Sequence, residues 1–445
     1  MKRYPVYRDS GLAFVGKIPQ HWEAKRAKYC FYEVDERSET GDEELLSVSH
    51  ITGVTPRSEK NITMFMAESY EGYKTCIPND LVINIMWAWM GALGVSKYQG
   101  IISSAYGVYR PKDTNKFYSD YLEYLVRIPE YIAEYTRTSK GIRSSRLRMY
   151  SDDFFQIPII CPLFEEQKTI ARFLDRKLEQ ISHFISNKQR LIELLKEQKT
   201  AIINRAVTKG INPHAPMKPS AIEWLGEIPA HWQQIKIKYV LHQIIDTEHK
   251  TAPFYEDGQY LVVRTSNIKG GMLDFTNAKY TNLDGFLEWT RRGKPKLGDI
   301  LFTREAPAGE ACLVPQGIDL CLGQRVVLFR VNHQKLNEEF GVYSIYGGIA
   351  AEFITLLSQG ATVPHFNMSD IANIPLLLPS VNEQQQIVQY IKTETSKIDE
   401  VIAKAEKEIE LIQEYRTTLI SDAVTGKIDV RETSAVESTL TAAAI

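Results

Sequence analysis

The heptapeptides GKIPQHW (16–22) and GEIPAHW (226–232) lie 210 positions apart and share five of their seven residues. Proline fixes φ and cannot donate a backbone hydrogen bond, so each copy is typical of a turn that leads into a strand. We expect the rings of Trp22 and Trp232 to be buried beneath that turn, as core anchors rather than as ligand contacts. Together with these tryptophans, Pro19 and Pro229 are the expected structural anchors of the repeat. A chain that uses one local structure twice is expected to contain a duplicated fold.

The similarity extends to both ends of each half of the chain. Three pairs of segments align without a gap: SGLAFVGKIPQHWEAKRAKY (10–29) with SAIEWLGEIPAHWQQIKIKY (220–239), QIPIICPLFEEQKTIARFL (156–174) with NIPLLLPSVNEQQQIVQYI (373–391), and AVTKG (206–210) with AVTGK (423–427). The chain is therefore two tandem halves of roughly 210 residues, a duplication rather than a solenoid of short repeats. The middles of the halves diverge, with weak echoes such as PNDLVINI (78–85) and LGDILFTR (297–304).

The last part of each half has the apolar spacing of a long helix. Apolar residues recur at intervals of four and three, interrupted in the first half by Lys188 and Lys199. The positions are Leu174, Leu178, Ile181, Ile185, Ile192, Leu195, Ile202 and Ala206 in the first half, and Ile391, Ile398, Ile402, Ala405, Ile409, Ile412, Leu419 and Ala423 in the second. A period of 3.5 sustained over more than four heptads predicts coiled-coil helices. Each seam would be about 50 Å long at 1.5 Å per residue.

These patterns predict an α+β protein in which two globular α/β domains are joined by two long helices that form an antiparallel coiled coil with pseudo-two-fold symmetry. The expected parts are a globular domain over 1–164, a helix over 165–209, a globular domain over 210–381, a helix over 382–428 and a disordered tail over 429–445. Two alternatives stay open, because each helix could pack on its own domain or pair with a second chain.

The composition limits the class of protein. Of the 445 residues 44% are apolar and 24% are charged, the net charge is −2, and no apolar run is long enough to cross a membrane. The N-terminal MKRYPVYRDS lacks the apolar core of a secretory signal. The five cysteines form no CxxC pair and the nine histidines have no metal-ligand spacing, so we expect no metal site and a reducing, cytoplasmic location.

We find no sequence motif for catalysis. The chain has no phosphate-binding GxxxxGK[ST] loop, no GxGxxG after a strand, no base-holding Asn/Asp-Pro-Pro-Tyr/Phe motif and no nuclease-like carboxylate cluster. Asp80 and Asp299 occupy similar positions in the two halves, but each follows a turn and precedes a strand. Their predicted role is therefore in the turn and not in chemistry.

Basic residues gather in the divergent middles. TRTSKGIRSSRLR (136–148) contains five cations and no acid, and WTRRGKPK (289–296) contains four cations. Such segments can neutralise phosphates, and arginine can also form two hydrogen bonds to guanine, although a charge run is more often just a solvated face. The candidate DNA-binding residues are Arg137, Lys140, Arg143, Arg146, Arg148, Arg264, Arg291, Arg292, Lys294, Arg304, Gln324, Arg325 and His365.

The whole arrangement resembles the specificity (S) subunits of type I restriction–modification enzymes. The resemblance rests on the twin GxIPxHW segments, on the paired IPxxxPxxxEQ segments (157–167 and 374–384) that open the long helices, and on the helix ends AVTKG and AVTGK. In that family the divergent middles are target recognition domains, which here would be residues 1–164 and 210–381. The two helices would act as a spacer between them.

The resemblance implies a non-catalytic subunit that reads double-stranded DNA at a bipartite, asymmetric target. Two methyltransferase (M) subunits would add S-adenosylmethionine-dependent adenine N6 methylation, and two restriction (R) subunits would add cleavage that requires ATP and Mg²⁺. No cofactor is expected on this chain itself. Two rivals remain, a coiled-coil interaction scaffold without a DNA role and a fused methyltransferase or nuclease. Salt-dependent binding to a bipartite site would argue against the first, and methylation by the purified chain alone would support the second.

Overall fold

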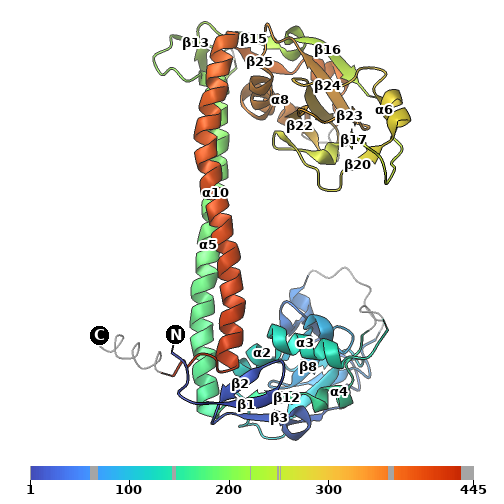
Figure 1. Cartoon of the computed structure of the whole chain (residues 1–445), viewed down its shortest axis with the longest axis vertical. Helices are drawn as coiled ribbons and strands as arrows, with labels where there is room; N and C mark the ends of the chain where they lie inside the picture. The colour runs from blue at the N-terminus through green and yellow to red at the C-terminus, as the bar shows by residue number, and fades with distance from the viewer. Residues whose placement is uncertain are drawn as a thin grey trace. The chain divides into compact units, whose positions relative to one another are not determined.

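The computed structural model describes residues 2–60, 69–142, 147–220, 222–247, 250, 252–358 and 365–431. The chain forms two compact units, one made of Met1–Lys188 with Lys407–Ile445 and the other of Gln189–Glu406. Each unit contains one globular domain and a part of both long helices (Figure 1). The first unit is thus built from both ends of the chain, whereas the second is one continuous stretch.

The beginning and the end of both halves have the same order of elements, whereas the middle of the second half contains an additional helix, α6. The first half contains β1 (Tyr7–Leu12), β2 (Gly16–Pro19), β3 (Glu23–Arg26), α1 (Ala27–Cys30), β4 (Phe31–Glu33), β5 (Leu46–Ser49), β6 (Gly53–Pro56), η1 (Arg57–Glu59), β7 (Lys74–Cys76), β8 (Leu81–Ile83), η2 (Ala88–Met90), β9 (Leu93–Val95), β10 (Gly100–Ile102), β11 (Gly107–Pro111), α2 (Ser119–Val126), α3 (Pro129–Thr138), α4 (Ser151–Gln156), β12 (Pro158–Cys161) and α5 (Phe164–Lys209). The second half contains β13 (Met217–Pro219), β14 (Glu227–Pro229), β15 (Gln233–Lys236), η4 (Ile237–Val240), β16 (Leu241–Asp246), β17 (Tyr260–Val263), η5 (Thr265–Asn267), β18 (Ile268–Lys269), β19 (Met272–Leu273), β20 (Lys279–Thr281), α6 (Leu283–Trp289), β21 (Ile300–Arg304), β22 (Ala308–Leu313), β23 (Leu320–Leu322), β24 (Val326–Val331), α7 (Glu338–Tyr346), α8 (Gly348–Ser358), α9 (Met368–Ala372), β25 (Pro375–Leu378) and α10 (Val381–Val424).

The two long helices pair with each other inside each unit, in antiparallel fashion. In the first unit Leu174 and Ile181 of α5 share a core with Leu419 and Ala423 near the end of α10. In the second unit the end of α5 shares a core with the beginning of α10. The predicted antiparallel pairing within one chain is therefore confirmed.

The two lysines that interrupt the apolar seam make ion pairs across the helix pair. Lys188 Nζ lies 2.5 Å from Glu408 Oε2 in the first unit, and Lys199 Nζ lies 2.7 Å from Asp399 Oδ1 in the second. A lysine can lay its apolar stem along the seam while its charged end reaches an acid at the rim. These interruptions therefore leave the coiled coil intact.

The same four-stranded antiparallel sheet forms in both units, although their middle sequences diverge. Its strand order is β4-β11-β8-β9 in the first unit and β16-β24-β21-β22 in the second. The weakly similar segments 78–85 and 297–304 supply the equivalent strands β8 and β21. Both strands are buried along their whole length, which explains why β8 (LVI) and the first three residues of β21 (ILFTR) are apolar.

Asp80 and Asp299 stand at the start of these equivalent strands and have the predicted turn role. The carboxylate of Asp80 accepts a hydrogen bond from the backbone N–H of Ile77, and that of Asp299 accepts one from Lys296. Each carboxylate also binds an arginine of the neighbouring strand through two nitrogen atoms, Arg110 at 2.8 and 3.0 Å and Arg330 at 3.2 and 2.9 Å. The acids are structural pairs in both units.

The repeated sequence motifs contact one another within each unit. The strand after GxIPxHW pairs with the strand of IPxxxP, as β3 with β12 and as β15 with β25. Gln167 and Gln384 of the EQ dipeptides are fully buried. Gln167 accepts from Tyr118 N and donates to the carbonyls of Lys116 and Pro162, and Gln384 makes the same three bonds to Asn337, Lys335 and Pro379. Because all the hydrogen-bonding groups of each buried amide are satisfied, each glutamine holds the segment around residues 116–118 or 335–337 against the start of its long helix.

The histidine of each heptapeptide faces the glutamate of an EQ dipeptide. His21 Nε2 lies 2.9 Å from Glu166 Oε2, and His231 Nε2 lies 2.8 Å from Glu383 Oε2. Trp232 Nε1 donates to the second oxygen of Glu383, whereas the hydroxyl of Tyr4 donates to the second oxygen of Glu166. The pairing explains why the two distant motifs recur together.

A helix end closes over each tryptophan. Trp22 and Trp232 are 1% and 0% exposed. Gly426, which follows α10, lies against Pro19 and Trp22, and Gly210, which follows α5, lies against Trp232. Both glycines have positive φ, at 77° and 72°, as is common where a helix ends.

The second helix and the tail differ from their expected limits. The helix expected over 382–428 ends at Val424, because Gly426 turns the chain. The tail expected to be disordered from 429 begins with ordered residues: Val430 is buried and the Asp429 N–H donates to Lys2 O. Residues 432–445 lie outside the described part of the chain. In that part no single helix is long and apolar enough to span a membrane, although the bent pair α7 and α8 meets the criterion jointly by length and composition.

Candidate nucleic-acid interface

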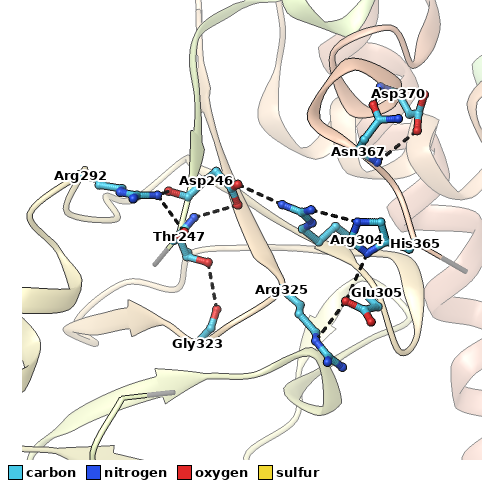
Figure 2. Close-up of polar contacts among 10 residues, drawn as sticks. All are labelled: Asp246, Thr247, Arg292, Arg304, Glu305, Gly323, Arg325, His365, Asn367 and Asp370. Atoms are coloured by element: carbon cyan, nitrogen blue, oxygen red, sulfur yellow. Dashed lines mark hydrogen bonds and ion pairs between the residues drawn. The ribbon is translucent and has the colours of Figure 1, made fainter. Parts of the chain in front are cut away.

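A chain of polar residues occupies one end of the sheet in the second unit, where β16 and β21 end and β24 begins (Figure 2). Arg304, the last residue of β21, is at its centre with a side chain that is only 10% exposed. Its guanidinium donates to Asp246 Oδ2 at 3.0 Å and to His365 Nε2 at 3.2 Å. The buried arginine thus has a carboxylate on one side and an imidazole on the other.

The outer part of this chain of contacts is exposed. His365 Nδ1 lies 3.3 Å from Glu305 Oε2, and Arg325 Nε lies 3.1 Å from the same oxygen. The side chains of His365 and Arg325 are 52% and 43% exposed. Because Arg304 donates to Nε2, the histidine pairs with Glu305 through the other ring nitrogen, which can carry the proton. The buried part of the network therefore orients the exposed part.

The backbone around the network is also constrained. Arg325 has a φ of 76°, a left-handed conformation that costs a non-glycine residue about 1 kcal/mol or more. His365 forms a backbone bridge with Glu305, and Phe366 N donates to Arg304 O. Asn367 then begins α9 with a reciprocal pair of side-chain bonds to Asp370, visible in Figure 2. The exposed histidine is thus held between two fixed segments.

The basic segment 289–296 adjoins this network through one arginine. Arg292 Nη1 donates to the carbonyl of Thr247 at 2.9 Å and to that of Asp246 at 3.4 Å (Figure 2). Lys294 is paired with Asp319 at 2.8 Å. Arg291 is exposed and has no ion-pair partner within the described residues. Of the predicted arginines in this segment, Arg291 is therefore the one free to meet a phosphate.

Two further candidates lie close to the network without joining it. Arg264 Nη2 donates to Asn277 O, and its neighbour Thr265 donates to Ala306 O beside Glu305. Gln324 is half-buried next to Arg325. Arg264, Arg304, Gln324, Arg325 and His365 thus lie at one end of the sheet, although they are scattered over a hundred residues of sequence. Lys294 lies toward the other end, because its carbonyl accepts from Arg330 beside Asp299.

The basic segment of the first unit lies at the corresponding end of its own sheet. Lys140 and Arg148 exchange two backbone hydrogen bonds of 2.9 Å, which close the loop between them. Met149 N donates to the carbonyl of Ile85, which follows β8 at the position that Arg304 occupies in β21. Arg143 and Arg146 lie outside the described residues. This end of the sheet corresponds to the one that Arg292 of segment 289–296 contacts in the second unit.

Two of the cations in this segment have acidic partners outside it. Arg137 binds Glu134 through two nitrogens at 2.7 and 2.6 Å, and Lys140 Nζ lies 2.8 Å from Asp153. The ion pairs raise the pKa of both cations. Both side chains remain about 70% exposed, so the acids compensate their charge without covering them. The segment is consequently less positive than its sequence indicates.

Sequence reasoning missed the acidic members of the second-unit network. Asp246 and Glu305 have no motif, and the search for a DNA interface considered cations and amides. One signal was available, because Arg304 ends a strand that begins with three apolar residues, and a buried arginine requires an acidic partner. In the first unit Trp87 is 50% exposed just beyond β8, an aromatic surface that charge reasoning also overlooked.

Comparison with known proteins gives one consistent result. The model of the family described as "Type I restriction modification DNA specificity domain" matches residues 25–197 and again residues 229–411. The specificity subunit of the type I restriction enzyme MjaVIII of Methanocaldococcus jannaschii is 26% identical over 366 residues, which are 80% of this chain and 81% of that one. The EcoKI specificity subunit of Escherichia coli is 20% identical over 364 residues, or 79% and 75% of the two chains.

Solved structures show the same fold. A structure described as "Structural basis underlying complex assembly and conformational transition of the type I R-M system" has a TM-score of 0.67 at 14% identity, covering 92% of this chain and 99% of that chain. The HsdS subunit of Thermoanaerobacter tengcongensis has a TM-score of 0.53 at 15% identity, covering 92% and 98%. Since the family model covers well over half of the sequence, once in each half, the chain belongs to the family of type I restriction–modification DNA specificity subunits.

Proposed function

We propose that this specificity subunit reads a bipartite, asymmetric site in double-stranded DNA, with one unit for each half-site. The observation that carries the proposal is the pair of equivalent sheets that present different polar groups at the same end. Arg304 and its network stand in the second unit where Ile85 stands in the first. Because specific bases are recognised by individual side chains, units that differ at this end should read different half-sites.

The methylation and cleavage activities would come from partner subunits that bind this chain. Two methyltransferase subunits, one per unit, would carry S-adenosylmethionine and methylate adenine at N6. Two restriction subunits would use ATP and Mg²⁺ to cleave DNA, and the complex would act in the cytoplasm. The antiparallel helix pair would set the number of base pairs between the half-sites. Inserting four residues after both Glu197 and Glu414 should then change this spacer or abolish assembly, and unchanged spacing with full activity would refute that role.

Mapping of N6-methyladenine tests the proposed recognition directly. Genomic DNA of the host should contain one bipartite methylated motif that disappears when this gene is deleted and returns with the intact gene. A motif that is palindromic, or that persists without the gene, would overturn the proposal.

Variants of the second unit then connect the motif to the network. Arg325→Ala and His365→Ala should relax the sequence requirement at one half-site only, by about 1–3 kcal/mol of discrimination per lost base contact. Arg291→Ala should instead weaken binding to all sequences alike and reduce the salt dependence by about one phosphate contact. Replacing Arg143, Arg146 and Arg148 together by alanine should act on the other half-site. If every variant affected both half-sites equally, the assignment of one half-site to each unit would be wrong.

A further inference from the structure

A lysine–tyrosine pair on the surface is repeated at the same place in both units. It follows the heptapeptide and consists of Lys28 and Tyr29 in the first unit and of Lys238 and Tyr239 in the second. The tyrosines are 64% and 60% exposed, and each has its own lysine over the ring, at 5.1 and 5.4 Å from the ring centroid. The two residues and the position of the lysine over the ring are the same in both units, although Lys238 also donates to Asn373 Oδ1 at 3.2 Å.

The buried neighbours of this corner did change. Ala27 is replaced by Ile237 and Cys30 by Val240, and all four residues are 4% exposed or less. Packing thus tolerates substitution on the inner side, while the residues on the solvent side are identical. A large exposed aromatic side chain that recurs at the same position in both units is typical of a surface that binds a partner.

The corner is basic in both units. Arg26 and Lys236 occupy equivalent exposed positions at the ends of β3 and β15. A further lysine comes from the connection after the sheet in each unit, since Lys112 Nζ donates to Lys28 O and Lys335 Nζ donates to Tyr239 O. We name the set Arg26, Lys28, Tyr29 and Lys112, with its counterpart Lys236, Lys238, Tyr239 and Lys335, the lysine–tyrosine corner. Within the described residues none of these cations has an ion pair with a carboxylate, so the corner lacks an acidic partner.

The corner lies at the sheet end opposite to the candidate DNA interface. Tyr239 lies just before β16, and Asp246 ends that strand beside Arg304. The strand itself is about 17 Å long at 3.3 Å per residue. In the first unit Tyr29 precedes β4 beside Pro111, and the basic loop attaches at the far end of β8 through Ile85. Two surfaces at opposite ends of one sheet can be occupied at the same time.

We propose that the lysine–tyrosine corner is where an acidic face of a methyltransferase subunit docks, one copy on each unit. The proposal rests on the proposed function, which supplies the partner. Two similar surfaces fit two copies of one protein, and an exposed tyrosine among cations without a carboxylate partner is the type of residue that dominates protein interfaces. The partner's carboxylates would neutralise the lysines while its apolar atoms cover the tyrosine ring.

Variants of one unit at a time provide the test. The full chain is produced with the methyltransferase subunit encoded beside it, and the mass of the purified complex is measured. Lys28→Glu with Tyr29→Ala, or Lys238→Glu with Tyr239→Ala, should reduce two bound copies to one, and the fourfold variant should bind none at concentrations that saturate the wild type. Loss of an aromatic anchor in each site corresponds to about 30-fold weaker binding or more.

The chain contains its own control. Lys279 and Tyr280 form the same dipeptide in the divergent part of the second unit, with Tyr280 38% exposed. Lys279→Glu with Tyr280→Ala should leave two copies bound. Lys28 is half-buried and the other altered side chains are exposed, and an unchanged melting temperature confirms that each variant is folded.

The outcomes separate the possible failures. If the corner variants bind as many methyltransferase copies as the wild type, the corner is not the docking site. If they instead weaken binding of the isolated chain to DNA of any sequence and lower its salt dependence, the corner is a phosphate contact and the proposal is overturned. A wild-type chain that binds no methyltransferase subunit would overturn the proposed function itself. In that case the Lys279/Tyr280 control variant would bind no subunit either.

Discussion

Replacement of Asp246 by alanine tests whether the second-unit network is a preorganised framework. The substitution removes the carboxylate that faces Arg304 at 3.0 Å, and it also removes the bond from Thr247 N to Asp246 Oδ1. Loss of one partner of a buried ion pair costs about 3–5 kcal/mol, because the other charge is left uncompensated. Since the Arg304 side chain is 10% exposed and that of Asp246 is 20% exposed, we expect the low end, about 3 kcal/mol.

A matched control is available in the same unit. Lys294 and Asp319 form an ion pair of similar length, 2.8 Å, but both side chains are more than half exposed. Asp319→Ala should therefore cost less than about 1 kcal/mol. Hydrogen exchange of the β16 and β21 amides measures the opening free energy locally, so the first unit does not obscure the result.

A second variant separates charge from shape. Asp246→Leu combined with Arg304→Met removes both charges and should recover most of the stability lost in Asp246→Ala, because an apolar pair of similar volume leaves no buried charge. Recognition of one half-site should remain impaired in this double variant. If Asp246→Ala and Asp319→Ala destabilised the strands equally, the argument that burial strengthens this network would be refuted.

Three further changes have outcomes that follow from the structure. Gln384→Leu leaves one N–H and two carbonyls without partners and should cost roughly 3 kcal/mol, seen as faster exchange of the Asn337 amide, and Gln167→Leu should do the same in the first unit. Gly426→Ala should lower the melting temperature more than Gly210→Ala, because an added Cβ would lie 2.4 Å from Pro19 in the first case and 3.2 Å from Trp232 in the second; equal shifts would contradict the tighter packing at Gly426. All five cysteines are buried free thiols, and burial raises the pKa of Cys312 to about 12, so a thiolate-specific reagent at pH 8 should label the native chain slowly and modify all five thiols after unfolding.

The sequence predicted the family, the long helices and their antiparallel pairing because these depend on residues whose spacing is visible without a structure. The seam residues repeat at a fixed period, and the heptapeptide and EQ motifs are kept because His21, Glu166 and their counterparts contact one another. The equivalence of the two sheets was harder to see. Strands buried on both sides require only apolar residues, so β8 and β21 could diverge in sequence while keeping one place in the sheet.

The candidate interface was predicted only in part, for a physical reason. Charge along the sequence identifies cations, but it does not show which acids fold against them. Arg137 and Lys140 are paired with Glu134 and Asp153, and Arg304 is buried rather than presented to solvent. These partners are set by tertiary contacts, which neither composition nor periodicity reveals.

The unequal continuity of the two units has a consequence for synthesis. Residues 189–406 form the second unit without interruption, so a nascent chain can complete that unit as soon as it leaves the ribosome. The core of the first unit, made early, includes Leu419, Ala423, Val424 and Val430. These residues are synthesised only after the whole of the second unit, so the core of the N-terminal domain stays incomplete until the second unit has been made.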